Sequence, residues 1–279
     1  MASVSYGVIA TSEPFTILVG PDRKVFMMHK ELLAAMSKPL NALVAGGMKE
    51  SRERCAEWPE MDEETFIRFC EFAYTGDYKV AKPKVIDKRE RTDVDNAKNK
   101  PHDRNHCIAT YVPEPLSCSN TKQQPELPTK KDRLTLEFVN RKYQVPEAGH
   151  KDQEEIESAI DKDDLSYRDE LLSIARLYVV GDYYDIERLR ILSLQKLHTS
   201  LGAFNYLVDV DIEDLSALAD YTYENTIRNL TNKDGLRDLV STFIACNAEA
   251  MWANPHFQAA LECVEFSRDI IERLLSKGE

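Results

Sequence analysis

The sequence lacks any apolar run close to the roughly 20 residues that a bilayer-spanning helix requires. Its first fifteen residues also lack the basic start of a secretory leader. We therefore expect a soluble intracellular protein, cytoplasmic or nuclear, with no membrane partner. The six cysteines are few and scattered, so we expect free thiols in a reducing compartment rather than a disulfide framework.

Basic residues are fewer than acidic residues. The 36 Lys and Arg residues face 48 Asp and Glu residues, which gives a formal net charge of −12. An acidic surface cannot cover phosphates over an extended area, so nucleic acid is not an expected partner. Phosphate-binding loops, nucleophile elbows and metalloprotease helices are absent, and Gly46-Gly47 lacks the spaced glycines of a phosphate cradle. We expect no cofactor and no enzymatic activity.

The 279 residues, 43% of them apolar, are enough for one large or two modest domains. Seven of the 12 prolines but a single glycine lie in residues 79–164, where apolar side chains are sparse. This composition predicts a long, largely irregular insertion. Inside it, Leu134 to Val139 alternates between apolar and polar residues, which predicts a half-buried strand.

Before the insertion, the apolar runs 15–19 and 25–28 are separated by the turn cluster 20–24 and predict a β-hairpin. Two short helices should follow, separated at Pro39. Residues 54–58 predict a third strand. Asp62 is placed to cap a helix whose stripe of Phe66, Phe69, Cys70 and Ala73 must face a core, and this helix should end at residues 74–77.

After the insertion the pattern is helical. Apolar residues at 171–179 and 186–194 predict two helices with Gly181 as the stop between them, the second buried on several sides. Helical periodicity continues from residue 205 to the end of the chain. Within it, residues 231–234 have the form of a capping box that starts at Thr231.

Three segments resemble motifs of the BTB/POZ domain. Residues 25–37 resemble its "φ-x-x-H-K-x-x-L-x-x-x-S" segment, 47–51 its "G-φ-x-E-S" element and 69–78 its "φ-x-Y-T-G-x-Y" element. Residues 177–189 look like the helix pair that completes such a domain. The sequence is similar to the BTB proteins abundant in filamentous fungi.

The resemblance implies an α+β fold, a small mixed sheet packed with helical hairpins. It implies a BTB domain at residues 14–198, split by the insertion 79–164, and a helical C-terminal extension at 199–279. It also implies a protein-interaction module that acts as scaffold or adaptor, including the role of substrate adaptor for a cullin-based ubiquitin ligase.

Particular residues follow from the resemblance. In BTB adaptors the φ-x-E element, here Met48 and Glu50, lies against the cullin scaffold. The other interpretation is that Met48 covers the core and Glu50 is exposed, and both stay open on sequence alone. BTB domains also commonly pair through their first helix, which makes Leu32, Met36 and Leu40 candidates for self-association into a homo-oligomer.

Two other functions stay open on sequence alone. The protein could be a transcription-associated oligomerisation protein, or an enzyme with a site between the BTB core and the C-terminal helices. A zinc site has weak candidates in the insertion, but their spacing is irregular and favours a loop with incidental ligands: His102, His106, Cys107 and Cys118. His29 is expected to pack and hydrogen-bond at the hairpin-to-helix junction, and Cys70 to behave as a small core residue.

Overall fold

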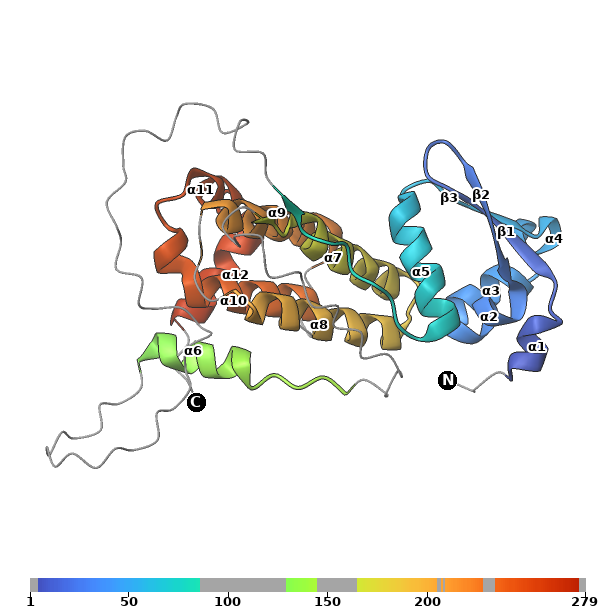
Figure 1. The fold of residues 1–279 in the computed structure, drawn as a ribbon, viewed down its shortest axis with the longest axis horizontal. Helices are drawn as coiled ribbons and strands as arrows, with labels where there is room; N and C mark the ends of the chain where they lie inside the picture. The colour runs from blue at the N-terminus through green and yellow to red at the C-terminus, as the bar shows by residue number, and fades with distance from the viewer. Residues whose placement is uncertain are drawn as a thin grey trace, which may run out of the picture. The chain divides into compact units, whose positions relative to one another are not determined.

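A computed structural model describes residues 5–85, 129–144, 165–204, 207, 209–227 and 234–275. The chain divides into two compact units (Figure 1). The N-terminal unit comprises residues 1–81, 143–154 and 173–195, and the helical unit comprises 82–142, 155–172 and 196–279. We describe each unit by itself.

A three-stranded mixed sheet forms the centre of the N-terminal unit. After the short helix α1 (Tyr6–Ala10), the strands β1 (Pro14–Val19) and β2 (Lys24–His29) form an antiparallel hairpin. The strand β3 (Cys55–Trp58) pairs with β1 in parallel, which gives the order β2-β1-β3. The predicted hairpin and third strand are thus confirmed.

Four helices accompany the sheet: α2 (Lys30–Met36), α3 (Lys38–Ala45), α4 (Lys49–Glu53) and α5 (Glu63–Thr75). The break between α2 and α3 lies at Ser37, whose hydroxyl caps α3 by accepting a hydrogen bond from the Leu40 amide at 3.2 Å. Pro39 falls inside the first turn of α3, where its missing N–H is tolerated. Asp62 caps α5 as predicted, and Gly76 ends it with a φ of 81°.

The core of the N-terminal unit joins segments from both sides of the insertion. Phe15, Phe66 and Phe69 are fully buried in one cluster with Leu177 and Leu189, which come from the later helices. The Tyr78 hydroxyl lies 2.9 Å from the hydroxyl of Ser193. Residues more than a hundred positions apart therefore share one apolar core.

The two later helices are α7 (Arg168–Tyr183) and α8 (Glu187–Gly202). The prediction that Gly181 stops the first of them is wrong, because α7 continues to Tyr183 and the left-handed residue of the turn is Asp185, with a φ of 52°. Gly181 instead allows close packing, because it has no side chain. A Cβ there would come within 3.0 Å of Cγ and 3.1 Å of the amide nitrogen of Arg190.

The helical unit contains a two-stranded ribbon of β4 (Lys84–Val85) and β5 (Leu165–Ser166). Its remaining helices are α6 (Lys130–Val139), α9 (Asp209–Asn225), α10 (Gly235–Met251), α11 (Pro255–Ala260) and α12 (Val264–Leu275). The predicted helical C-terminal region is confirmed. In the described ranges, no helix combines the length and apolar character needed to cross a membrane.

The strand predicted within the insertion is wrong, because those residues form most of α6. Thr129 and Asp132 make a capping box in which the Asp132 carboxylate accepts a hydrogen bond from the Thr129 amide at 2.8 Å. Leu134 and Phe138 are buried, whereas Leu136 is exposed. Positions 134 and 138 match both a strand and a helix, and the cap together with the i, i+4 pair favours the helix.

The start of α10 also differs from the prediction. Asp234, not Thr231, is the N-cap residue, since its carboxylate accepts hydrogen bonds from the amides of Leu236 and Arg237 at 3.0 Å each. Aspartate is among the preferred N-cap residues, so the cap lies one turn later than the box pattern placed it. Thr231 lies outside the described residues.

Candidate partner-binding surface

Met48 lies at the surface of the N-terminal unit. The chain leaves α3 through Gly46 and turns at Gly47, whose φ is 79°, and this places Met48 at the N-cap position of α4. The Met48 side chain is 51% exposed and is not part of the core cluster. The interpretation that Met48 covers the core is therefore wrong.

Hydrogen bonds hold the backbone around Met48 in place. The Ser51 hydroxyl donates to the Met48 carbonyl at 2.9 Å, and Nε of Arg52 donates to the Gly47 carbonyl at 3.0 Å. Glu50 is half-buried in the first turn of the same helix. Met48 is thus presented on a fixed turn, with a carboxylate two residues away.

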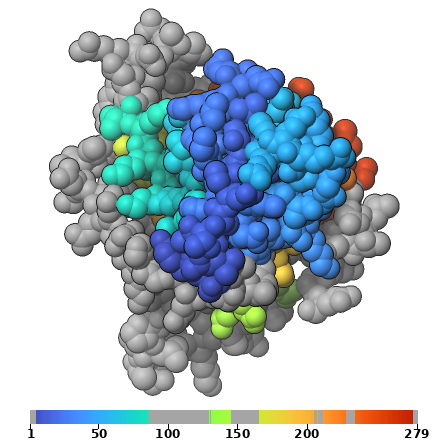
Figure 2. All heavy atoms as spheres, turned by 90° about the vertical axis from the view of Figure 1, so that its right-hand side faces the viewer, coloured from blue at the N-terminus to red at the C-terminus, as the bar shows by residue number. Residues whose placement is uncertain are grey.

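The segment from α3 to β3 faces outward. In the space-filling view of all heavy atoms, this segment and α1 both contribute to the visible face (Figure 2). Exposed charged side chains surround Met48 in sequence, including Lys49, which lies 3.9 Å from Glu53, and Arg54, which lies 2.9 Å from Glu13. An apolar side chain with a charged surround is the usual composition of a small protein-binding surface.

The three predicted self-association residues are in a different environment. Leu32, Met36 and Leu40 belong to the core cluster, and Leu40 has no exposed surface at all. The resemblance that suggested them does not hold for their side chains, because α2 and α3 pack these residues on the chain's own core. These side chains are not available at the surface of a single copy.

Sequence reasoning missed two exposed apolar residues on β2. Met27 is 68% exposed and Val25 is 59% exposed, and they stand opposite Thr16 and Leu18 of β1 on the outer face of the sheet. A half-buried antiparallel strand usually places polar residues on that face. Residues 25–28 are all apolar, so no alternation in the sequence marked positions 25 and 27 as exposed.

The comparisons agree with this architecture. Residues 15–94 match the family model of the BTB/POZ domain. The N-terminal region contains a BTB/POZ domain. A comparison with the curated proteins finds no match. The BTB domain is a protein-interaction module that mediates association and oligomerisation and is not typically catalytic, which supports an interaction or adaptor role in general terms.

Other candidate residues of the BTB domain have structural roles. Nδ1 of His29 lies 2.8 Å from the Tyr74 hydroxyl, at the junction of β2 and α2. Burial raises the pKa of the Cys70 thiol to about 12, so Cys70 stays protonated at neutral pH and is a poor nucleophile. The zinc candidates His102, His106, Cys107 and Cys118 lie outside the described residues.

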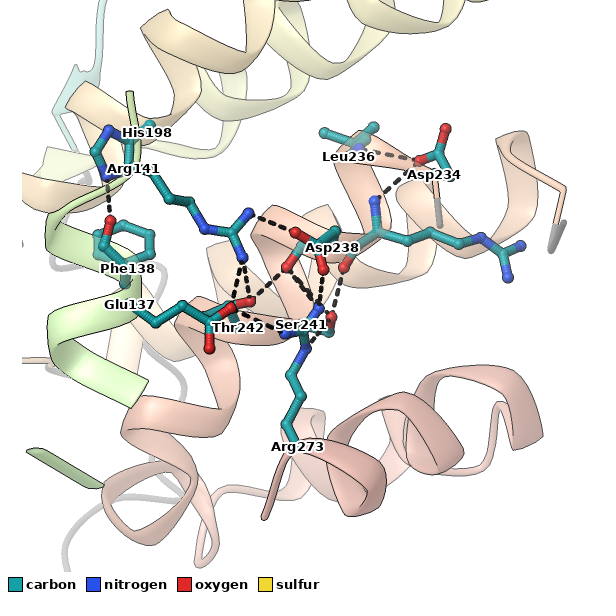
Figure 3. Close-up of polar contacts among 11 residues, drawn as sticks. Glu137, Phe138, Arg141, His198, Asp234, Leu236, Asp238, Ser241, Thr242 and Arg273 are labelled. Carbon is teal, nitrogen blue, oxygen red and sulfur yellow. Dashed lines mark hydrogen bonds and ion pairs between the residues drawn. The ribbon is translucent and has the colours of Figure 1, made fainter. Parts of the chain in front are cut away.

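A second polar site lies in the helical unit, where two arginines converge on Asp238 of α10 (Figure 3). Nη1 of Arg141 lies 2.7 Å from Oδ2 of Asp238, and Nη2 of Arg273 lies 2.6 Å from Oδ1. Burial by itself would raise the pKa of Asp238. The attraction of the two guanidinium groups is the larger effect and holds the pKa below its ordinary range.

Hydroxyl groups complete this cluster. Thr242 accepts a hydrogen bond from Nη2 of Arg141 at 2.8 Å, and Ser241 accepts one from Nε of Arg273 at 2.7 Å. Glu137 of α6 lies 3.9 Å from Arg273. No sequence pattern joins these residues, because 97 positions separate Arg141 from Asp238. The charges are mutually compensated, and the cluster connects α6 and the segment that follows it with α10 and α12.

Proposed function

We propose that this protein is a non-catalytic adaptor whose BTB domain binds a cullin scaffold through Met48 and Glu50. The observation that carries the proposal is the exposed Met48 at the start of α4, inside the segment that matches the BTB/POZ family model. An exposed thioether can enter a shallow apolar pocket without unfolding the domain. The Glu50 carboxylate can accept hydrogen bonds from the partner.

The direct test measures binding of the full chain to the N-terminal domain of a purified cullin. Met48→Ala removes apolar area and Glu50→Ala removes an acceptor, which at an interface centre costs about 1 to 3 kcal/mol each. Each substitution should therefore weaken binding about tenfold or more.

Matched controls separate a specific contact from a general effect. Met27→Ala removes an even more exposed methionine on β2, and Glu53→Ala removes a carboxylate from the far end of α4. Both controls should leave the affinity unchanged. If the unsubstituted protein binds no cullin, or if the Met48 variant binds as tightly as the Met27 variant, the adaptor role is rejected.

We also propose that the BTB domain spans residues 14–198, with 79–164 as an insertion and 199–279 as an extension. Leu177, Val180 and Leu192 lie in the same core as the sheet, which supports the assignment of α7 and α8 to this domain. Leu192→Ala should then lower cullin affinity and stability together. Loss of stability with unchanged affinity would argue against it.

Self-association is a second proposal, and it is compatible with a transcription-associated oligomerisation protein. The exposed pair Val25 and Met27 makes the outer face of the sheet a better candidate surface than Leu32, Met36 and Leu40. Light scattering of the double variant Val25→Glu/Met27→Glu tests it. A dimer that becomes a monomer supports the proposal, and a monomeric unsubstituted protein rejects it.

A further inference from the structure

The helix α6 lies antiparallel along one face of α10. Lys131 lies 3.8 Å from Glu249, the Phe138 ring centroid lies 5.2 Å from that of Phe243, and Arg141 binds Asp238. As the residue number rises along α6, the number of its partner on α10 falls. Lys131 and Phe138 are seven positions apart and therefore lie on a single side of α6, and Arg141 follows two residues after the helix ends at Val139.

Two side chains anchor this segment, Phe138 in the last turn of α6 and Arg141 just beyond it. Phe138 is almost fully buried between the rings of His198 and Phe243, with centroids 4.6 and 5.2 Å away. Arg141 uses two guanidinium nitrogens on two acceptors, Asp238 and Thr242. The pattern is an aromatic residue followed three positions later by an arginine.

The surface that receives α6 comprises His198 from α8, Asp238, Thr242, Phe243 and Cys246 from α10, and Arg273 from α12; we call it the α6-docking face. The charged side chains of this face have polar partners on the face itself, even without α6. Asp238 keeps Arg273 as a partner, and Arg273 keeps Ser241. Removal of α6 would therefore leave no unpaired buried carboxylate on the α6-docking face.

The helix is held in the chain at both ends. Residues 86–128 connect α6 to β4, and residues 145–164 connect it to β5. The strands β4 and β5 pair with each other, Val85 opposite Leu165. Displacement of α6 would therefore leave the two-stranded ribbon of β4 and β5 in place.

We propose that α6, together with Arg141 just beyond its end, is an intramolecular ligand of the α6-docking face, and that the same face binds a partner helix whose last turn carries an aromatic residue, with an arginine three positions later in the chain. The partner helix replaces α6. Since α6 is tethered, it competes at high effective concentration, and the partner binds tightly only when α6 is weakened or withdrawn. This proposal is independent of the cullin contact.

The test uses the full chain and a fluorescent synthetic peptide of residues 129–144 as probe. In the chain, Phe138→Ala/Arg141→Ala removes both anchors of the resident helix and should expose the α6-docking face. This variant should bind the peptide at least about tenfold more tightly than the unsubstituted chain. Equal affinity, or no binding to the variant, overturns the proposal.

Matched controls define the specificity. Leu136→Ala/Val139→Ala alters the exposed side of α6 and should leave peptide binding as in the unsubstituted chain. A peptide carrying Arg141→Lys should bind the anchor variant more weakly, because an ammonium group does not reproduce the two-nitrogen contact with Asp238 and Thr242. If both peptides bind alike, the recognition pattern proposed here is wrong.

Hydrogen exchange of the unsubstituted chain gives a second measurement. Amides of α6 should exchange faster than those of α10, and an excess of peptide should accelerate exchange in α6 alone. If α6 exchanges only with global unfolding, or if the anchor variant fails to fold, then α6 is an integral part of the core and the proposal is overturned.

Discussion

Arg141 and Arg273 approach Asp238 with two guanidinium groups, at 2.7 and 2.6 Å from its two carboxylate oxygens. Both arginine side chains are largely buried, at 15% and 8% exposure. A single carboxylate thus neutralises charge from α12 and from the segment that follows α6. The stability of the helical unit should depend strongly on this residue.

Asp238→Asn should destabilise the protein by about 3 kcal/mol, because it leaves the more exposed Glu137 as the only carboxylate near two largely buried guanidinium groups. Chemical denaturation followed by circular dichroism measures the change. Asp220→Asn on α9 is a control with an exposed carboxylate and should cost much less. A loss below about 1 kcal/mol for Asp238→Asn would show that solvent compensates the arginines.

The pH dependence of stability should differ in sign between two carboxyl groups. The pKa of Asp238 lies below its ordinary range in the folded state, so the stability that Asp238 contributes is present above about pH 4 and is lost as the pH falls through the folded pKa. Burial raises the pKa of Asp214, despite hydrogen bonds from Ser166 and Tyr167. Its contribution is complete below about pH 4 and declines as the pH rises through the folded pKa.

Denaturation curves from pH 2.5 to 6 for Asp238→Asn and Asp214→Asn measure these contributions. The difference in unfolding free energy between the unsubstituted protein and the Asp238 variant should shrink toward low pH. The corresponding difference for the Asp214 variant should grow. Parallel profiles for both variants would contradict the assignment.

Gly76→Ala should destabilise the BTB domain by about 1 to 3 kcal/mol. Its φ of 81° disfavours a side chain, and a Cβ would come within 2.5 Å of Nη2 of Arg188. Gly202→Ala is the matched control, because nothing lies within 4 Å of its Cβ position. Thermal unfolding of both variants checks this, and equal melting temperatures would count against it.

Leu40→Ala should cost about 2 to 5 kcal/mol, because it leaves a cavity at a fully buried position. Met48→Ala should leave the unfolding free energy within about 0.5 kcal/mol of the unsubstituted value, since half of its side chain is in solvent. The two variants separate a core residue from a surface residue in the same domain. A stability loss at Met48 comparable to that at Leu40 would reverse our assignment.

Local patterns in the sequence were sufficient for the β-hairpin and for α5 of the BTB domain. The hairpin follows from two apolar runs around a turn cluster, and α5 follows from the cap at Asp62 and the aromatic stripe. These signals lie within a few residues of one another. They depend on backbone geometry and side-chain period, which a short segment determines by itself.

Only the tertiary structure decided which apolar residues are buried and which charged residues meet. Leu40 and Met48 are both apolar and lie eight positions apart, yet the first is buried in the core and the second is half exposed, because burial depends on what packs against each helix. The α6 segment has a strand-like alternation, but its cap and the contacts of Phe138 and Arg141 with distant residues stabilise a helix. The convergence of Arg141 and Arg273 on Asp238 could not be read from the sequence, because ion pairs between distant segments leave no local periodicity.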